Sequence, residues 1–315
     1  MRTLDKQFIF VVGAPRSGTS WLHQMIAAHP KVAGMANEEL TVFSRYVSPW
    51  VNNFRAEERN MAEGKWSQGL PCLFTAVEFE QRMLTFVDEV YARVDARNPG
   101  ATHILDKHPN YSNHMALIDH MLPRSRFIHI IRDGREVAVS MMSARKRIGH
   151  SPGEVRGAAQ EWHRCVTAAQ AYGLQLGATR YMEVRYDQLF AGTATGLAEV
   201  LAFCGLEDEN GFIARIAQTN HISVKQISSG DTNNNALRTQ PGAIWKTRLS
   251  LRERYRFDLI AGNLLLRLGY ADRGWWSLGP MDRARMLAYP LLSRMKRSFR
   301  SLTGIWGSPL EERLS

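Results

Sequence analysis

The sequence predicts an α/β protein with a P-loop-like, three-layer fold, in which a central parallel β-sheet is flanked by helices. Short apolar runs rich in β-branched residues, typical of buried strands, alternate with segments that carry apolar residues at helical spacing. The first run leads through a turn with two glycines directly into a helical pattern. Since strands that alternate with helices form parallel sheets with right-handed crossovers, both faces of the sheet should be covered.

The elements follow one another along most of the chain. Strands are expected over residues 8–12, 103–107, 126–132 and 180–186. Helices are expected from residue 20 to the His29-Pro30 break and over residues 74–94, 115–121, 135–147, 155–176, 197–204 and 251–268. Residues 31–39 should form a loop or short strand, residues 41–75 an irregular lid or substrate-facing insertion, and residues 228–242 a loop.

Two of the helical patterns also predict which side chains face the core. In the helix over 74–94 the predicted face consists of Val77, Met83, Leu84, Val87 and Val90. In the helix over 135–147 it consists of Val137, Met141 and Ala144. The three cysteines, Cys72, Cys165 and Cys204, have no paired ligand spacing, so we expect reduced, buried side chains and no metal site.

Composition restricts the classes of partner. The formal net charge is +10 and the pI is 9.8, which favours anionic ligands or surfaces. No zinc-finger spacing, RNP-like aromatic motif or repeat accompanies this charge, so we expect no nucleic-acid partner. The N-terminal apolar run is too short for a signal peptide and no run could span a bilayer, which predicts a cytoplasmic protein.

The chain is expected to form one domain over residues 1–272 with an extension over residues 273–315. Residues 283–300 hold six basic and no acidic residues, interleaved with large apolar ones and interrupted by Pro290. A basic amphipathic segment of this kind can lie on an anionic membrane surface, pack in a homodimer, or remain a solvated helix pinned to the domain. All three possibilities stay open at this point.

The turn over residues 13–20 predicts an anion site. A strand-to-helix turn directs backbone N–H groups and a helix N-terminus at one small volume. Gly13, Gly18 and Ser20 match the nucleotide-triphosphate P-loop, but Thr19 stands where its lysine would be, and Arg16 supplies a cation from within the loop. Without that lysine, the main charge on a transferring phosphoryl group is lost, which favours a different anion.

This turn also carries a family resemblance. The stretch PRSGTSWL, followed by HP, closely resembles the 5′-phosphosulfate-binding loop of sulfotransferases that use 3′-phosphoadenosine 5′-phosphosulfate (PAPS). The resemblance implies a set of donor-binding residues in this loop. These are Arg16, Ser17, Gly18, Thr19, Ser20 and Trp21.

A second motif lies in RFIHIIRDGREVAVSMMSARKR, residues 126–147. An arginine at a strand end, an Asp-Gly turn and a serine in the following helix can converge on one anion, and arginine bonds phosphate oxygens bidentately. The stretch resembles the 3′-phosphate site of PAPS sulfotransferases, which implies that Arg132 and Ser140 bind that phosphate. The alternative is a strand, turn and helix capped by Asp133, without a ligand.

The catalytic residues come from a resemblance to the tyrosylprotein sulfotransferase branch and its bacterial relatives. Lys107, in the segment LDKHP, would stabilise the leaving phosphate oxygen. Glu39 would be the general base that takes the acceptor proton, with Glu38 as the alternative. Because a histidine is the base in the cytosolic branch, His108 or His103 remains a further possibility.

Two later segments match the family more loosely. Lys246, with the serines at positions 228 and 229, resembles a pattern in which a serine and a lysine close over the donor. The stretch YMEVRYDQL resembles a later strand, with Asp187 where glutamate is usual, and we expect it to be structural.

Together these features, and the resemblance they carry, predict a metal-independent sulfotransferase that uses PAPS and a hydroxyl acceptor of the saccharide, lipid-linked, phenolic or tyrosyl class. A P-loop kinase of a small hydroxylated substrate is the alternative enzyme, and it requires magnesium-dependent ATP turnover. A non-catalytic binder of anions or nucleotides is the third possibility. Residues 40–75 and the late loop over 228–242 are expected to build the acceptor pocket, so the sequence leaves the acceptor open.

Overall fold

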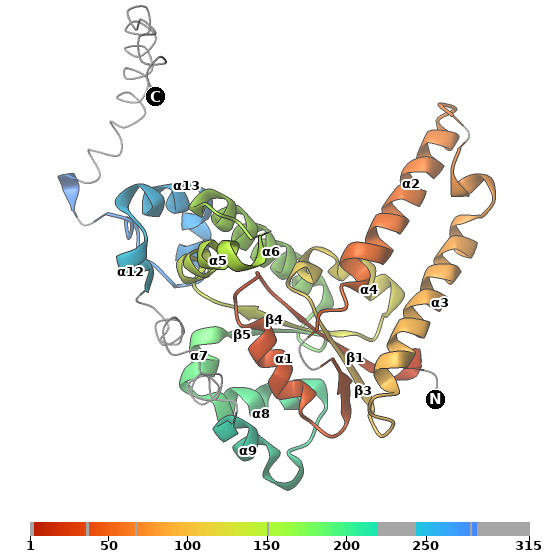
Figure 1. Ribbon diagram of the computed structural model, residues 1–315, viewed down its shortest axis with the longest axis horizontal. Coiled ribbons are helices and arrows are strands. Elements are labelled where there is room, and N and C mark those ends of the chain that lie inside the picture. The colour runs from red at the N-terminus through yellow and green to blue at the C-terminus, as the bar shows by residue number, and fades with distance from the viewer. Residues whose placement is uncertain are drawn as a thin grey trace, which may run out of the picture.

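Five parallel strands form one sheet at the centre of the molecule (Figure 1). The structure is a computed structural model that describes residues 3–35, 38–66, 68–149, 151–219, 244–277 and 279–281. The strands are β1 (Gln7–Val12), β2 (Val32–Gly34), β3 (His103–Lys107), β4 (Arg126–Ile131) and β5 (Tyr181–Arg185), in the order β2-β3-β1-β4-β5. All pairs are parallel, which confirms the predicted fold class.

Helices fill the connections between the strands. The α-helices are α1 (Thr19–Ala27), α2 (Ser48–Ala62), α3 (Ala76–Asp95), α4 (Met115–Met121), α5 (Gly134–Ile148), α6 (Val155–Leu176), α7 (Tyr186–Ala191), α8 (Thr193–Cys204), α9 (Phe212–Thr219), α12 (Ile244–Arg248) and α13 (Leu251–Arg267). Shorter turns are the 3₁₀ segments η1 (Thr3–Asp5), η3 (Leu70–Cys72), η4 (Pro109–Asn113) and η5 (Glu209–Gly211) and the π-helical η2 (Val42–Val47).

The side chains of β1 divide between the two faces of the sheet. Phe8, Phe10 and Val12 pack in the core that contains η2, α2, α3, α4 and η4. Ile9 and Val11 point the other way, into the core made with α1, α7, α8 and α9. A third core joins α5, α6, α12 and α13. Because successive strand residues face opposite sides, one apolar run forms the middle layer of a three-layer structure.

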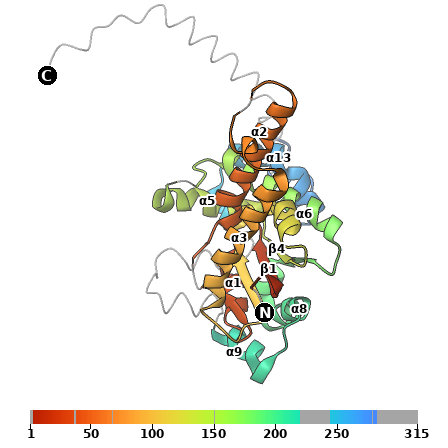
Figure 2. The same cartoon turned by 90° about the vertical axis from the view of Figure 1, so that its right-hand side faces the viewer.

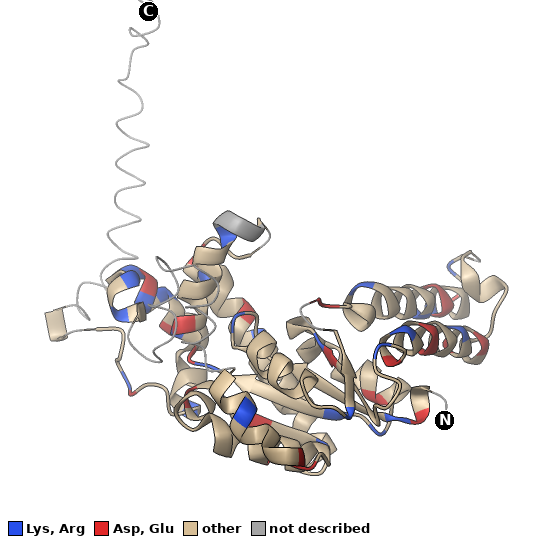
Figure 3. Ribbon diagram, turned by 60° about the horizontal axis from the view of Figure 1, so that its bottom comes forward, with Lys and Arg blue, Asp and Glu red and all other residues tan. Residues whose placement is uncertain are grey.

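The irregular lid expected over residues 41–75 was wrong, whereas the substrate-facing insertion stays a prediction. The chain forms η2 and α2, and α2 and α3 lie side by side as an arm that projects from the sheet (Figures 1 and 2). The helix α2 packs by a narrow stripe, Ser48, Val51 and Phe54, at helical spacing, and Phe54 stacks on Phe79 at 4.3 Å between ring centroids. Charged residues of both signs lie elsewhere along the arm (Figure 3). The apolar periodicity of α2 was therefore too weak to recognise in the sequence.

Two details of burial also differ from expectation. Val77 is 78% exposed, and the buried face of α3 is formed by Phe79, Met83, Val87, Tyr91 and Val94. Cys165 and Cys204 are buried, and burial raises the pKa of each thiol to about 12. Cys72 is exposed at the tip of the arm, so the prediction of a buried side chain was wrong there. The loop predicted over 228–242 and the basic segment 283–300 lie outside the described residues.

Acidification between pH 6.5 and 5 is expected to destabilise the fold. Burial lowers the pKa of His129 to about 3, and burial with the nearby Lys107 lowers that of His23 to about 4. Below pH 6.5 the unfolded chain therefore binds more protons than the folded one, so stability falls as the pH falls. Each histidine should remove about 2 kcal/mol between pH 6.5 and 5, measured by urea unfolding. His129→Gln should flatten this dependence, whereas His120→Gln, at a 52% exposed side chain, should not.

Candidate active site

Three segments meet at the carboxyl edge of the sheet. β1 lies at the centre, with β3 on one side and β4 on the other. In open α/β sheets, ligands bind beyond the strand ends at such a switch point. The turn after β1, Lys107 at the end of β3 and Arg132 directly after β4 all lie at this edge. The fold thus brings the three main sequence motifs together.

The turn between β1 and α1 has an unusual backbone. Gly18 has a φ of 100°, and Arg16, with a φ of 71°, adopts the left-handed region that non-glycine residues rarely occupy. At Gly13, a Cβ would lie 2.5 Å from the carbonyl oxygen of Ile130. The hydroxyl of Ser112 accepts a hydrogen bond of 3.0 Å from the N–H of Gly13. Backbone strain of this kind is concentrated at ligand-binding turns.

The turn presents a hydroxyl that is set to bind a ligand. The Ser17 side chain is fully buried, and its Oγ has no hydrogen-bond partner in the described part of the chain. Buried hydroxyls are normally satisfied, so this donor fits an incoming anionic oxygen. Thr19 is also buried, whereas Ser20 is exposed at the start of α1. The N-terminus of α1 adds backbone N–H groups to the same side of the turn.

A direct contact joins the two anion motifs. The Nε of Arg16, in the turn, donates a hydrogen bond of 3.1 Å to the Oγ of Ser140 in α5. The Val137, Met141 and Ala144 side chains of α5 are fully buried as predicted. This packing fixes the helix, and with it the position of Ser140 beside the turn.

The ring of Tyr186 makes a second connection between the turn and the Arg132 motif. The guanidinium of Arg132 lies 4.4 Å from the centroid of the Tyr186 ring. The same ring contacts Trp21 edge-on at 5.6 Å, and a Cβ at Gly18 would lie 2.6 Å from it. Tyr186 therefore lies between the turn and Arg132. Sequence reasoning assigned no ligand role to this tyrosine, although it belongs to the RYD segment taken as structural.

Arg132 is anchored at its backbone as well. The indole N–H of Trp162 donates to the Arg132 carbonyl oxygen at 3.1 Å. Glu136, one turn into α5, places Oε2 at 3.8 Å from Nη2 of Arg132. Burial raises the pKa of the Glu136 carboxyl, and the positive charge of Arg132 opposes this shift. These contacts hold Arg132 at the carboxyl edge of the sheet and restrict the orientation of its side chain.

Asp133 caps α5, as the alternative interpretation of this motif predicted. Its carboxylate accepts from the N–H of Arg135 at 2.9 Å and from the guanidinium of the same residue. That guanidinium contacts the rings of both Trp245 and Trp275, at 4.1 and 4.8 Å. Arg135 therefore stabilises the turn, and the neighbouring Arg132 lines the cavity described below. The cap by Asp133 leaves Arg132 and Ser140 as candidates for an anion site.

A cavity of about 540 Å³ opens beside Arg132. Arg132, Tyr186, Trp245 and Lys246 line it, together with residues 269–275. Lys246 is exposed on α12, so the structure brings it to the same cavity as Arg132. Asp187 accepts a hydrogen bond of 3.1 Å from the Tyr270 hydroxyl, which agrees with its expected structural role. The serines at positions 228 and 229 lie outside the described residues.

Lys107 connects the turn to the predicted base. Its side chain is only 3% exposed, and Nζ donates to Ser20 Oγ at 3.0 Å and to Glu39 Oε1 at 2.5 Å. The other carboxylate oxygen of Glu39 lies 3.5 Å from Nε2 of His108. A cation, a carboxylate and the first turn of α1 thus share one small region, which suits the transfer of an anionic group to a hydroxyl.

A buried aspartate fixes the end of β3. Asp106 accepts hydrogen bonds from the hydroxyls of Tyr91 and Tyr111, at 2.7 and 3.0 Å, and from the N–H of Lys107 at 2.7 Å. Burial raises the pKa of this carboxyl, and the hydrogen bonds act against that shift. Because Tyr91 belongs to α3 and Tyr111 to η4, Asp106 holds both elements against the strand that carries Lys107.

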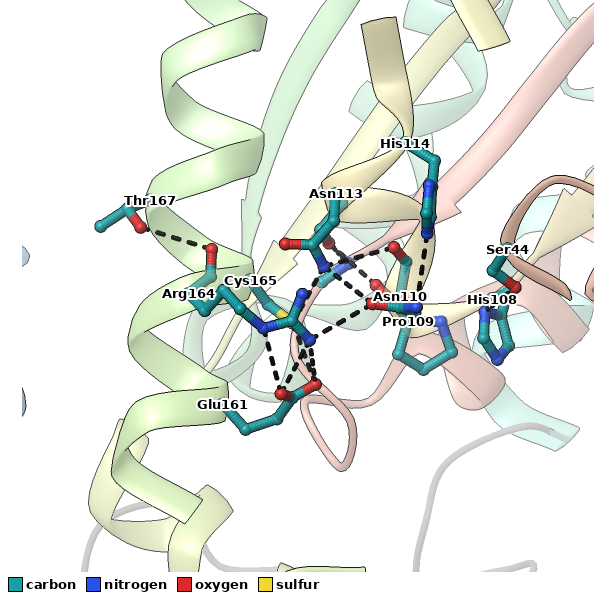
Figure 4. Close-up of polar contacts among 12 residues, drawn as sticks. Ser44, His108, Pro109, Asn110, Asn113, His114, Glu161, Arg164, Cys165 and Thr167 are labelled. Atoms are coloured by element: carbon teal, nitrogen blue, oxygen red, sulfur yellow. Dashed lines mark hydrogen bonds and ion pairs between the residues drawn. The ribbon is translucent and has the colours of Figure 1, made fainter. Parts of the chain in front are cut away.

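The other candidate bases lie in different surroundings. Glu38 is exposed in the segment before Glu39. His103 is at the opposite end of β3 from Lys107, with its Nε2 3.1 Å from the carbonyl oxygen of Cys204. His108 lies next to Ser44 of η2 (Figure 4). Ion pairs join Glu39 to both Lys107 and His108.

The described residues form neither a metal-binding cluster nor a membrane-spanning helix. No group of three or more His, Cys, Asp or Glu side chains there has an arrangement that could hold a metal ion. Among the same residues, no helix is both long and apolar enough to cross a membrane.

Known proteins share this sequence pattern. A model of the sulfotransferase family matches residues 8–210. The chain is 26% identical to protein-tyrosine sulfotransferase 2 of Gallus gallus over 206 residues, which cover 64% of this chain and 52% of the chicken protein. It is 24% identical to protein-tyrosine sulfotransferase 1 of Danio rerio over 274 residues, or 84% and 73% of the two chains. The chain therefore spans about half to three quarters of these relatives.

A bacterial relative and a solved structure extend the comparison. The nodulation protein NoeE of Sinorhizobium fredii is 24% identical over 284 residues, which cover 83% of this chain and 65% of that protein. The sulfotransferase domain from the Synechococcus PCC 7002 olefin synthase superposes with a TM-score of 0.50 at 18% identity, over 82% of this chain and 94% of that domain. This last likeness concerns the fold.

Proposed function

This chain belongs to the sulfotransferase family, and on that premise we propose that it transfers a sulfuryl group from PAPS to a hydroxyl acceptor. One observation carries most of the proposal. The turn after β1 is joined to the Arg132 region twice, through the Arg16–Ser140 hydrogen bond and through the Tyr186 ring. A ligand with an anionic group at each end, separated by a nucleoside, matches two cationic sites held in this way.

The residues present fit such a donor. Ser17 Oγ, buried and lacking a partner among the described residues, would bond the 5′-phosphosulfate, together with Arg16, Gly18, Thr19, Ser20 and Trp21 of the same turn. Arg132 and Ser140 would bind the 3′-phosphate, and Lys246 would approach from α12. Tyr186 would lie between them. Its ring is large and partly apolar, so it suits the nucleoside part of the donor.

The donor supplies the sulfuryl group, and the chain supplies proton transfer and charge stabilisation. Glu39 takes the proton of the acceptor hydroxyl as the bond from that oxygen to sulfur forms. The bond from sulfur to the bridging phosphate oxygen breaks, and its electron pair remains on the phosphate. Lys107 stabilises this negative charge, which is greater in the transition state than in the ground state, so its contribution lowers the barrier.

A direct assay with a panel of acceptors determines the acceptor class. Relatives are named as protein-tyrosine sulfotransferases, so a tyrosine peptide belongs in the first panel, beside a phenol and a pyranose oligosaccharide. Incubation with [³⁵S]PAPS should label at least one of these acceptors. ATP turnover dependent on magnesium, with no transfer of sulfate, would instead support a P-loop kinase.

Discrimination for the 3′-phosphate tests the donor assignment by binding alone. Calorimetry should give tighter binding of adenosine 3′,5′-bisphosphate than of ADP. Arg132→Gln should weaken binding of the bisphosphate about 10- to 100-fold, because it removes charge-assisted hydrogen bonds, and should leave ADP nearly unchanged. Arg156→Gln, at an exposed arginine of α6, is the control. Equal affinity of the wild type for both nucleotides would contradict the assignment.

A further inference from the structure

The Glu39 carboxylate depends on other side chains for its orientation. It lies in the segment 38–41, which has no regular secondary structure, and its side chain is 35% exposed. Two contacts hold it, one on each oxygen: Lys107 on Oε1 at 2.5 Å and His108 Nε2 on Oε2 at 3.5 Å. A base carried by a loop must be held by its neighbours if it is to meet the acceptor hydroxyl in a productive geometry.

His108 is itself held firmly. It follows β3 directly and its side chain is 16% exposed, with its ring packed edge-on against Tyr111 at 5.3 Å. Its Nδ1 lies 3.1 Å from the hydroxyl of Ser44 in η2 (Figure 4). Ser44 is 3.4 Å from the carbonyl oxygen of Thr41, a longer contact. The shorter distance favours donation by the hydroxyl to Nδ1, which places the ring proton on Nε2, toward Glu39.

From this geometry we propose that His108 is a positioning residue that directs its Nε2–H at Glu39 and is oriented in turn by Ser44. The inference rests on the proposed function, since it assigns a partner to the base of that reaction. In this arrangement neither ring nitrogen has a lone pair available for the acceptor proton. His108 therefore acts through Glu39, and the acceptor proton goes to the carboxylate.

The charges around His108 agree with a neutral ring. The groups that face it are Glu39, Lys107, Arg45 of η2, and Tyr111 and His114 near η4. Burial lowers the pKa of His108 below 6.5, and Lys107, Arg45 and His114 lower it further, against the opposing effect of Glu39. At neutral pH the ring can thus donate a hydrogen bond to Glu39 without a second positive charge beside Lys107. Protonation of the ring at lower pH would place a second positive charge beside Lys107.

Four variants test this arrangement with two assays. The assays are [³⁵S]sulfuryl transfer to the best acceptor of the panel and the slower release of sulfate from PAPS to water, which needs no acceptor. His108→Ala should lower kcat about 10- to 100-fold and change KM for PAPS less than 2-fold, because the base is misplaced while the donor site is intact. His108→Gln, whose amide N–H can reach the position of Nε2, should restore most of the rate.

Substitutions of Ser44 provide the second part of the test. Ser44→Ala should lower kcat a few-fold, and the Ser44→Ala/His108→Ala double variant should be no slower than His108→Ala, since the serine acts through the histidine. The acid limb of the wild-type kcat profile below pH 6.5 should be weaker in His108→Gln. His163→Gln is the matched control, since His163 is a partly buried histidine of α6 that is not among the groups facing His108.

The outcomes separate this inference from the proposed function. If His108→Ala lowers kcat as far as Glu39→Gln does and His108→Gln does not rescue, His108 is itself the base and the inference fails. If all His108 variants keep the wild-type kcat, the contact with Glu39 has no role. If the wild type neither transfers sulfate nor prefers the 3′-phosphate nucleotide, the proposed function fails instead.

Discussion

Replacing Lys107 with methionine is expected to lower kcat for sulfuryl transfer about 10³-fold, while binding of adenosine 3′,5′-bisphosphate changes less than 10-fold. Removing a single donor aimed at a developing negative charge lowers kcat by about 10²- to 10³-fold in known active sites. Lys107 supplies a full charge, is 3% exposed, and bonds both Ser20 and Glu39. Its loss should therefore affect the leaving group and the base together.

The fold should survive this change. Methionine has nearly the volume of the lysine stem, and Glu39, at 35% exposed, can be solvated when its partner is lost. Lys31→Met removes a comparable ion pair, with Glu209 at 2.7 Å, from the surface, where Lys31 is 49% exposed. That control should retain wild-type kcat and wild-type stability within about 1 kcal/mol. A Lys107→Met enzyme with more than a tenth of the wild-type kcat would show that Lys107 does not stabilise the transition state.

Gly18→Ala is expected to abolish measurable donor binding, an effect of at least about 10²-fold on affinity. The new Cβ would lie 2.6 Å and 2.9 Å from two carbons of the Tyr186 ring, at a residue whose φ is 100°. The ring would have to move, and Arg132 stacks on its face at 4.4 Å. One methyl group should therefore distort both the turn and the 3′-phosphate site.

The Gly64→Ala variant is the control that separates the effect of the steric clash from the effect of backbone strain. Gly64 also has a positive φ, 68°, but nothing lies within 4 Å of a Cβ there. The Gly64→Ala variant should lose about 1 kcal/mol of stability from backbone strain. It should keep full affinity for adenosine 3′,5′-bisphosphate, measured by calorimetry. Wild-type affinity in Gly18→Ala would mean that the Tyr186 ring is not fixed where the structure has it.

The elements that local signals specify were predicted well. The strands at residues 8–12 and 103–107 are short apolar runs bounded by polar or glycine-rich turns, and both exist in the sheet. The helices at residues 115–121 and 155–176 match their predicted bounds, because proline or glycine marks their ends. The turn, Lys107 and Arg132 could be placed together from the sequence because each ends or directly follows a strand, and strand ends meet at one edge of a parallel sheet.

Features that depend on tertiary contacts were missed. The helix α2 carries a three-residue buried stripe among charges, too narrow for its periodicity to stand out. In the sequence, Tyr186 was predicted to be the last residue of a strand. Its ring reaches Gly18 because α7 packs against α1, which local spacing does not encode. The Ser44–His108–Glu39 contacts join the stretch 39–44 to His108, which lies 64 positions after Ser44, so no local spacing encodes them.

The α2–α3 arm has a consequence for how this enzyme can diversify. It lies within the crossover between β2 and β3, two strands that pair directly, whereas the residues proposed to bind the donor belong to the turn after β1, follow β4 directly, or lie in α1, α5, α7 and α12. Lengthening a connection whose ends are fixed has a small entropic penalty, about 0.6 kcal/mol per doubling. Descendant lineages can therefore lengthen, shorten or exchange this insertion without altering strand register, and chimeras joined at these two strands should retain the nucleotide half of the enzyme.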